Sequence, residues 1–104
     1  MPKSTAATVR VPQITSLETA IRLYYERIEL TNSDIRELFG PLANSTVKRL
    51  KEKAELLMVD RNITVWNAQR VNTEIAYEAW GLNIADLERR LKTLKAMEVQ
   101  SLKY

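Results

Sequence analysis

A short stretch of the sequence concentrates side chains that suit chemistry with an anionic polymer. Its cations are Lys48, Arg49, Lys51 and Lys53, and its short polar residues are Asn44, Ser45 and Thr46. Cationic side chains neutralise phosphate groups and release the counterions bound to them. Short polar side chains at the start of a helix can reach base edges in the major groove. The stretch therefore favours contact with double-stranded DNA, and the plain alternative is an ordinary solvated helix surface.

Two helices joined by a turn are expected to position these side chains. Asn32 and Ser33 are suitable N-cap residues for the first helix, and Gly40 with the proline after it should end that helix. The second helix should start from a cap at residues 44–45 and run over residues 46–55 or slightly beyond. Apolar residues at spacings of three and four give each helix one face to bury. They are Ile35, Leu38 and Phe39 in the first helix and Val47, Leu50, Ala54 and Leu57 in the second.

Several residues of this stretch match the sequence pattern of a known protein family. They are Leu30-Thr31, Asp34-Ile35, Gly40, Ser45-Thr46-Val47 and Arg49-Leu50-Lys51. The run resembles helix-turn-helix transcriptional regulators, in which the first helix of the pair supports and the second enters the major groove. It departs from that family at Arg36, where a small residue is usual, and in a turn between Gly40 and Val47 that is one residue longer. The resemblance implies a small regulator that binds double-stranded DNA, and we expect neither a cofactor nor a small-molecule effector.

Residues 15–29 predict one more helix in front of this pair. Thr15 and Glu18 fit a capping box. The apolar residues Leu17, Ala20, Ile21, Tyr24 and Ile28 share one face of that helix. Because glycine and proline are scarce, the expected fold class is mostly α. It consists of a three-helix helix-turn-helix domain followed by C-terminal helices.

Residues 56–66 are the candidate wing of a winged helix. Two apolar runs flank Asp60-Arg61-Asn62, and β-branched residues follow, which is typical of a small β-hairpin. In that case Arg61 at the tip would contact the DNA backbone. The open alternative is a loop whose apolar residues cover the core. Trp66 at the end of this segment is expected to anchor the C-terminal part to the domain.

The C-terminal part partly repeats the pattern of the first helix pair. Residues 72–75 echo residues 32–35, Gly81 echoes Gly40, and residues 90–92 echo residues 49–51. A degenerate second helix-turn-helix is one interpretation of this echo. Asp86 and Glu88 argue against a second DNA reader, because acidic side chains near the start of the last helix would repel phosphates.

A heptad seam is the other interpretation of this end. Its apolar residues, spaced four, three, four and three, are Trp80, Ile84, Leu87, Leu91 and Leu94. Such a seam packs on a partner helix, which belongs either to the same chain or to a second copy. In the second case the chain is a homodimer, and two reading helices about 34 Å apart would match a palindromic DNA site.

The composition argues against several other classes of protein. The chain has no cysteine and no histidine, which removes disulfides, zinc–thiolate sites and the commonest general base. The acid pairs Asp34 with Glu37 and Glu52 with Glu55 have the spacing of exposed helix faces, so we expect no catalysis and no metal site. No apolar run approaches the ~20 residues of a membrane helix, so we expect no membrane partner and a cytoplasmic location.

We therefore expect three segments. Residues 1–14 contain two prolines and little apolar surface, and they predict a flexible N-terminal arm. Residues 15–66 form the helix-turn-helix domain with or without a wing, and residues 67–104 form a helical segment for packing, dimerisation or a degenerate second helix-turn-helix. The net charge of +3 permits an acidic partner without requiring one. The alternative function is a non-enzymatic helical protein–protein adaptor, whose binding face is the apolar C-terminal helix.

Overall fold

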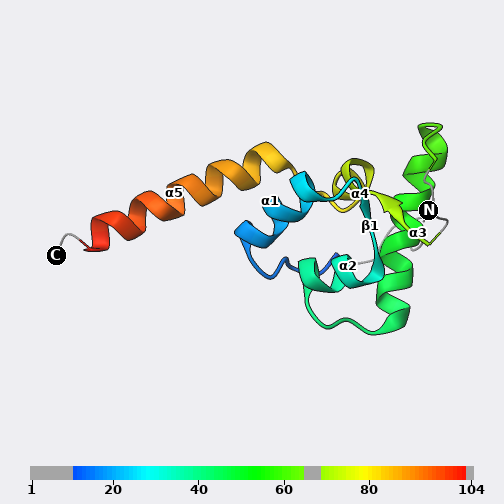
Figure 1. The fold of residues 1–104 in the computed structure, drawn as a ribbon, viewed down its shortest axis with the longest axis horizontal. Helices are drawn as coiled ribbons and strands as arrows, with labels where there is room; N and C mark the ends of the chain where they lie inside the picture. The colour runs from blue at the N-terminus through cyan, green and yellow to red at the C-terminus, as the bar shows by residue number, and fades with distance from the viewer. Residues whose placement is uncertain (1–10, 65–68, 103–104) are drawn as a thin grey trace, which may run out of the picture.

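The computed structural model describes residues 11–64 and 69–102, and it is mostly helical with one small pair of strands (Figure 1). The elements in chain order are α1 (Leu17–Glu26), β1 (Glu29–Leu30), α2 (Asn32–Phe39), α3 (Asn44–Asp60), β2 (Val71–Asn72), α4 (Thr73–Ala79) and α5 (Ile84–Leu102). The predicted fold class is confirmed. The predicted N-terminal arm lies largely outside the described residues, which begin at Val11.

The N-terminal cap of α1 differs from the predicted capping box of Thr15 and Glu18. Ser16 is the N-cap, and its hydroxyl accepts a 3.0 Å hydrogen bond from the main-chain N–H of Thr19. Thr15 instead contacts the end of α2, where both its N–H and its hydroxyl donate to the carbonyl oxygen of Leu38. Because Ser16 occupies the N-cap position, α1 begins at Leu17.

Two short strands join parts of the chain that are far apart in the sequence. β1 and β2 pair antiparallel, with Glu29 opposite Asn72 and Leu30 opposite Val71. Because residues 29–30 are extended, α1 ends at Glu26 rather than near Glu29 as predicted. Leu30 and Val71 are fully buried, so the pair contributes side chains to the core as well as main-chain hydrogen bonds.

The predicted hairpin over residues 56–66 is wrong where the structure describes it. Its first part continues α3 as far as Asp60, and Arg61 follows as the C-cap residue of that helix. The physical reason is that the buried stripe of α3 does not stop at Ala54 but continues at Met58, one turn further along. Trp66 lies outside the described residues. The small antiparallel pair of this fold is therefore β1 with β2, and not a local hairpin.

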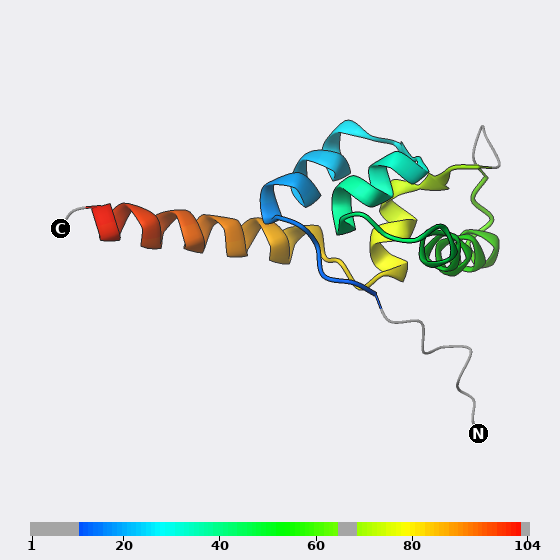
Figure 2. The ribbon, with the colours of Figure 1, turned by 90° about the horizontal axis from the view of Figure 1, so that it is seen from below.

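α4 lies at the centre of the molecule and contacts three other helices (Figure 2). Tyr77 donates a 2.5 Å hydrogen bond from its hydroxyl to the carbonyl oxygen of Ala20 in α1. Trp80 donates a 2.9 Å hydrogen bond from its indole N–H to the carbonyl oxygen of Leu50 in α3. The same indole packs edge-on against the ring of Phe39 in α2, with 5.3 Å between the ring centroids. α4 therefore fixes the relative positions of the helices around it.

The predicted apolar seam divides into a buried and an exposed part. Trp80 and Leu87 belong to the core, with only 4% and 6% of their surfaces exposed. α5 packs on α1 near its start, and its other end extends away from the body of the molecule (Figures 1 and 2). Leu94 is 45% exposed on that extension. Trp80 and Leu87 thus pack within the chain, which is one of the two alternatives that the seam left open.

The sequence echo corresponds to two segments with the same order of elements. Each has a short strand, a short helix, a glycine at positive φ and a long helix: β1, α2, Gly40 and α3 in the first, and β2, α4, Gly81 and α5 in the second. None of the helices within the described ranges is both long and apolar enough to cross a membrane.

Candidate nucleic-acid interface

The start of α2 is held by a reciprocal cap. Thr31 is the N-cap; its hydroxyl accepts from the N–H of Asp34 at 3.2 Å, and the Asp34 carboxylate accepts from the N–H of Thr31 at 3.0 Å. Asp34 is buried and also pairs with Arg27, at 3.3 Å between Oδ1 and Nε. The predicted caps, Asn32 and Ser33, are instead the first residues of the helix. α2 is therefore fixed both at its cap and to the end of α1.

The turn between α2 and α3 depends on the backbone of Gly40. Its φ is +100° and its ψ is −176°, a region that residues with a side chain rarely adopt. A Cβ atom at this position would lie 3.7 Å from the Cγ2 atom of Thr15, which is ordinary van der Waals contact. Glycine is therefore required by the backbone conformation and not by a lack of space. Gly40 is also the position at which the sequence predicted the end of the first helix.

Arg36 spans the turn that follows. Its Nε–H donates to the carbonyl oxygen of Leu42 at 3.2 Å, and its Nη2 donates to the side-chain Oδ1 of Asn44. Arg36 thereby ties the last turn of α2 to the first residue of α3. The long side chain of Arg36 therefore bridges the turn between the two helices.

α3 begins without a side-chain cap. Its N-cap is Ala43, whereas the sequence had favoured Asn44 or Ser45. Asn44 is instead the first residue of the helix, and its side chain accepts from Arg36. The buried face of α3 is formed by Val47, Leu50, Ala54 and Met58. Lys48 and Arg49 are exposed, whereas Lys51 and Lys53 are half-buried.

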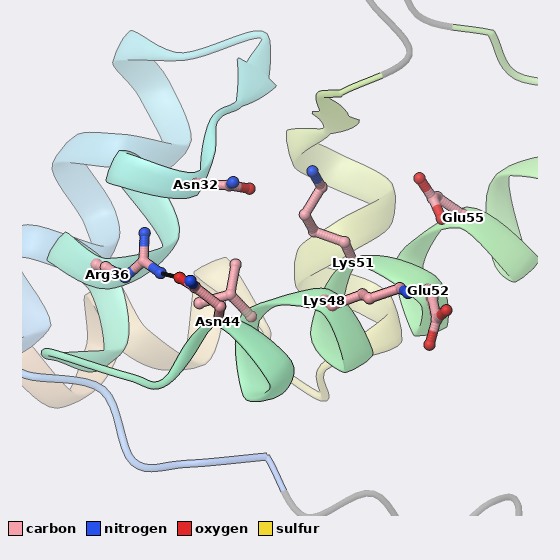
Figure 3. A pocket seen from close by; sticks show the side chains of 8 residues that line it. Asn32, Arg36, Asn44, Lys48, Lys51, Glu52 and Glu55 are labelled. Carbon is pink, nitrogen blue, oxygen red and sulfur yellow. Dashed lines mark hydrogen bonds between the residues drawn. The ribbon is translucent and has the colours of Figure 1, made fainter.

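A groove of about 380 Å³ lies between α2 and α3 (Figure 3). Its lining residues are Asn32, Arg36, Asn44, Val47, Lys48, Lys51, Glu52 and Glu55. The structure thus brings three of the predicted contact residues together with Arg36 and Asn32, which the sequence interpretation did not include. The unusual residue after Ile35 was the available signal for Arg36.

The other predicted contact residues of α3 lie outside the lining of this groove. They are Ser45, Thr46, Arg49 and Lys53. Each helical residue is rotated by about 100° from the one before it, which places Arg49 and Lys53 together on the opposite flank of α3. The basic residues of α3 therefore form two pairs, one in the groove and one on the far side.

Arg61 is engaged within the chain. It follows α3 rather than lying at a hairpin tip, and its guanidinium forms a two-point ion pair with the Glu78 carboxylate of α4, one contact being 2.8 Å. These hydrogen bonds raise the pKa of Arg61 and lower the pKa of Glu78. The predicted contact of Arg61 with DNA would first have to break this pair.

The cations of α3 differ from most arginines of the chain in having no acidic partner. Ion pairs engage Arg22, Arg27, Arg61, Arg89 and Arg90. Over residues 11–64 and 69–102, no ion pair involves Lys48, Arg49, Lys51 or Lys53. Their positive charge is therefore not compensated by a contacting carboxylate.

No family model, curated protein or solved structure matches the chain. Within the described part of the chain, no cluster of three acidic, cysteine or histidine side chains has the geometry to hold a metal ion. The geometry and charge of α2, α3 and the turn between them are therefore the features of the chain that bear on its function.

Proposed function

We propose that the chain binds double-stranded DNA through α3 and acts as a small helix-turn-helix transcriptional regulator. The observation that carries the proposal is the set of cations on α3 that have no acidic partner among the residues that the structure describes. Lysine and arginine side chains paired with carboxylates contribute little to binding an anion, whereas unpaired ones neutralise phosphates and release counterions. The exposed Lys48 and Arg49 are the side chains best placed to do so.

The rigidity of the helix pair supports the same proposal. Binding sites are most effective when the elements that carry them are already fixed before the ligand arrives. The reciprocal cap of Thr31 and Asp34 fixes the start of α2, and Arg36 bridges the turn between α2 and α3. The indole N–H of Trp80 bonds to the main chain of α3 on its buried side. In this proposal α2 supports and α3 enters the major groove, with Asn44, Ser45 and Thr46 near the bases.

The connection between α3 and β2 adds one further cation to this proposal. Residues 61–70 connect α3 to β2, and β2 pairs with β1 rather than with a neighbouring hairpin strand. Arg70, exposed just before β2, is the cation of this connection that has no ion pair among the described residues.

The extension of α5 supports a homodimer as a further part of the proposal. Leu94, Met97 and Val99 are exposed there, at 45%, 59% and 55% of their surfaces. Two copies joined through these helices would present two α3 helices to DNA, and a spacing of about 34 Å would suit a palindromic site. A regulator of this kind would work in the cytoplasm.

The test is fluorescence anisotropy of a labelled duplex of random sequence, titrated with the protein at several salt concentrations. Micromolar or tighter binding that weakens steeply with salt is expected, because each phosphate contact adds about 0.9 to the slope of log affinity against log salt. A protein that leaves the anisotropy unchanged even at low salt would contradict the proposal.

The second candidate function is a helical protein–protein adaptor. The exposed apolar residues of α5 favour it, because an apolar helix face outside the body of a domain is a common docking element. An adaptor needs the α5 face and not the α3 cations. Absence of duplex binding, together with a change in light scattering on substitution of the α5 residues, would favour this function.

A further inference from the structure

The second half of α3 carries a face that suits neither the core nor DNA. Leu56 and Val59 are 74% and 76% exposed there. Glu52 and Glu55 adjoin them on the same face, because residues three, four and seven apart are neighbours on a helix. Carboxylates at this place would repel phosphates. We call these four residues the acidic stripe, and they are open to a partner other than DNA.

The far part of α5 repeats this stripe with the charges reversed. α3 begins at Asn44 and α5 at Ile84, so residues 40 apart stand at the same place along the two helices. At that spacing a lysine corresponds to each glutamate, and an apolar residue corresponds to each apolar one. The four residues of this basic stripe are Lys92, Lys95, Ala96 and Val99. All residues from 92 to 99 are exposed, so the basic stripe is also open to a partner.

The charges of both stripes lack partners in the part of the chain that the structure describes. No ion pair there involves the four charged residues Glu52, Glu55, Lys92 and Lys95. In Figure 3 Lys48 extends along α3 toward Glu52, but the two side chains form no ion pair. Each stripe therefore presents charge that a stripe of the opposite sign would complement.

The two stripes lie toward opposite ends of the molecule (Figure 1). α3 stands at one end of the long axis, and α5 extends away from the body at the other end. The stripes therefore cannot meet within one copy. Complementary surfaces at different places on one chain are the requirement for a heterologous contact, in which one surface of a copy binds a different surface of the next copy.

We propose that the acidic stripe of one copy docks on the basic stripe of a second copy, with the two helices side by side and parallel. Each glutamate then lies opposite the lysine that corresponds to it. Leu56 faces the small Ala96, and the two valines, Val59 and Val99, face each other. Opposite charges across such a contact fix its register and suppress other pairings.

The valines select the parallel direction. An antiparallel pair of helices would still set both glutamates opposite the two lysines. It would, however, place Val59 opposite Glu88 and Val99 opposite Lys48. Only the parallel direction sets apolar residues against apolar ones as well as opposite charges against each other.

The contact has a consequence for DNA binding, and this step rests on the proposed function. A contact of four residues a side is small, so it is weak between free copies. Copies bound next to one another on DNA are held at a high effective concentration, which favours the contact. The chain should therefore bind long duplexes cooperatively. Leu94 and Met97 lie about 150° around α5 from the basic stripe, so the side that a symmetric α5 pair would use stays free.

Disulfide trapping tests the contact directly, because the natural chain has no cysteine. Full-length Val59→Cys copies are mixed with Val99→Cys copies that carry an isotopic mass label, and the mixture is oxidised mildly. A disulfide needs its two Cβ atoms within about 4.5 Å, so only facing positions should cross-link readily. Leu94→Cys in place of Val99→Cys is the matched control on the other side of α5. The mixed dimer should form about tenfold faster with Val99→Cys than with this control.

Charge reversal shows whether the stripes themselves drive the cross-link. Glu52→Lys with Glu55→Lys in the Val59→Cys copy should reduce the rate to that of the control, because lysines then face lysines. Lys92→Glu with Lys95→Glu in the other copy should restore the rate. A change of fold in one copy could not be repaired by a substitution in the other, so restoration assigns the effect to the contact.

The outcomes separate this inference from the proposed function. The trapping is done with and without a random-sequence duplex that is long enough for several copies, and the anisotropy titration reports DNA binding independently. Duplex binding with no preferential cross-link in either condition, or with no restoration by the second reversal, overturns the contact while DNA binding stands. A preferential, restorable cross-link without duplex binding keeps the contact and overturns the DNA proposal. If neither is seen, both proposals are overturned.

Discussion

The indole N–H of Trp80 donates a 2.9 Å hydrogen bond to the main-chain carbonyl oxygen of Leu50. The contact joins the end of α4 to the middle of α3, and the same ring packs against Phe39 of α2. One aromatic residue therefore fixes the helix pair that carries the candidate interface. The orientation of α3 thus depends on a side chain that lies 30 residues from Leu50 in the sequence.

The first prediction follows from this contact. Trp80→Phe keeps an aromatic ring in the core but loses the hydrogen bond and part of the buried volume. We expect the free energy of unfolding to fall by about 2–3 kcal/mol. Urea denaturation followed by circular dichroism measures it. Tyr25→Phe is the matched control, because it removes an exposed hydrogen bond to Glu88 and should change stability by less than about 0.5 kcal/mol.

A second prediction concerns the turn glycine. Gly40→Ala forces a side chain into a φ and ψ combination that is essentially restricted to glycine, at a cost of about 1–3 kcal/mol. Gly81→Ala also places a side chain at positive φ, +76°, where a Cβ atom would meet no atom within 4 Å. We expect Gly40→Ala to lower the melting temperature more than Gly81→Ala does. An equal or reversed order would show that the Gly40 backbone is not the constraint.

A third prediction tests Arg36 as the bridge of the turn. Arg36→Lys keeps the charge but removes the planar group that reaches Leu42 and Asn44 together. We expect a loss of about 1 kcal/mol in stability and a release of the Asn44 amide, seen as a shift of its NMR signal. DNA affinity should also fall although the net charge is unchanged. An Asn44 signal identical to that of the wild type would refute the bridge.

The fourth prediction concerns alkaline pH. Burial raises the pKa of Tyr77 above its usual value near 10. Since the folded-state pKa lies above the unfolded one, the stabilisation is complete below about pH 10 and is lost as the pH rises beyond it. Spectrophotometric titration should show one tyrosine ionising later than the others in the folded chain. Tyr77→Phe should remove that late step, and persistence of the step would assign it elsewhere.

Local patterns of the sequence predicted the helices and the apolar faces of α2 and α3 because these features repeat at short range. Ile35, Leu38, Val47 and Leu50 are all buried as their spacing indicates. Gly40 ends α2 as expected, because its position after an apolar stripe is itself a local signal.

Features that depend on distant residues could not be predicted in this way. β1 and β2 are two residues each and are stabilised by pairing across the fold, so neither has a strand pattern of its own. Thr15 was expected to cap α1 but contacts Leu38 instead. The groove required the side chain of Arg36 to meet Asn44 from another helix, which only the turn geometry decides.

The final prediction concerns the extension of α5. Leu94 and Met97 are exposed on one side of that helix, so Leu94→Asp with Met97→Asp should leave the fold intact. If the chain is a homodimer through α5, multi-angle light scattering should show a dimer for the wild type and a folded monomer for this variant, because charged side chains facing each other oppose association. Leu87→Asp is the contrasting variant: Leu87 is 6% exposed in the core, so this change should cost several kcal/mol and unfold much of the chain. A wild type that is monomeric at high micromolar concentration would exclude the α5 dimer. A double variant that remains dimeric would place the interface elsewhere.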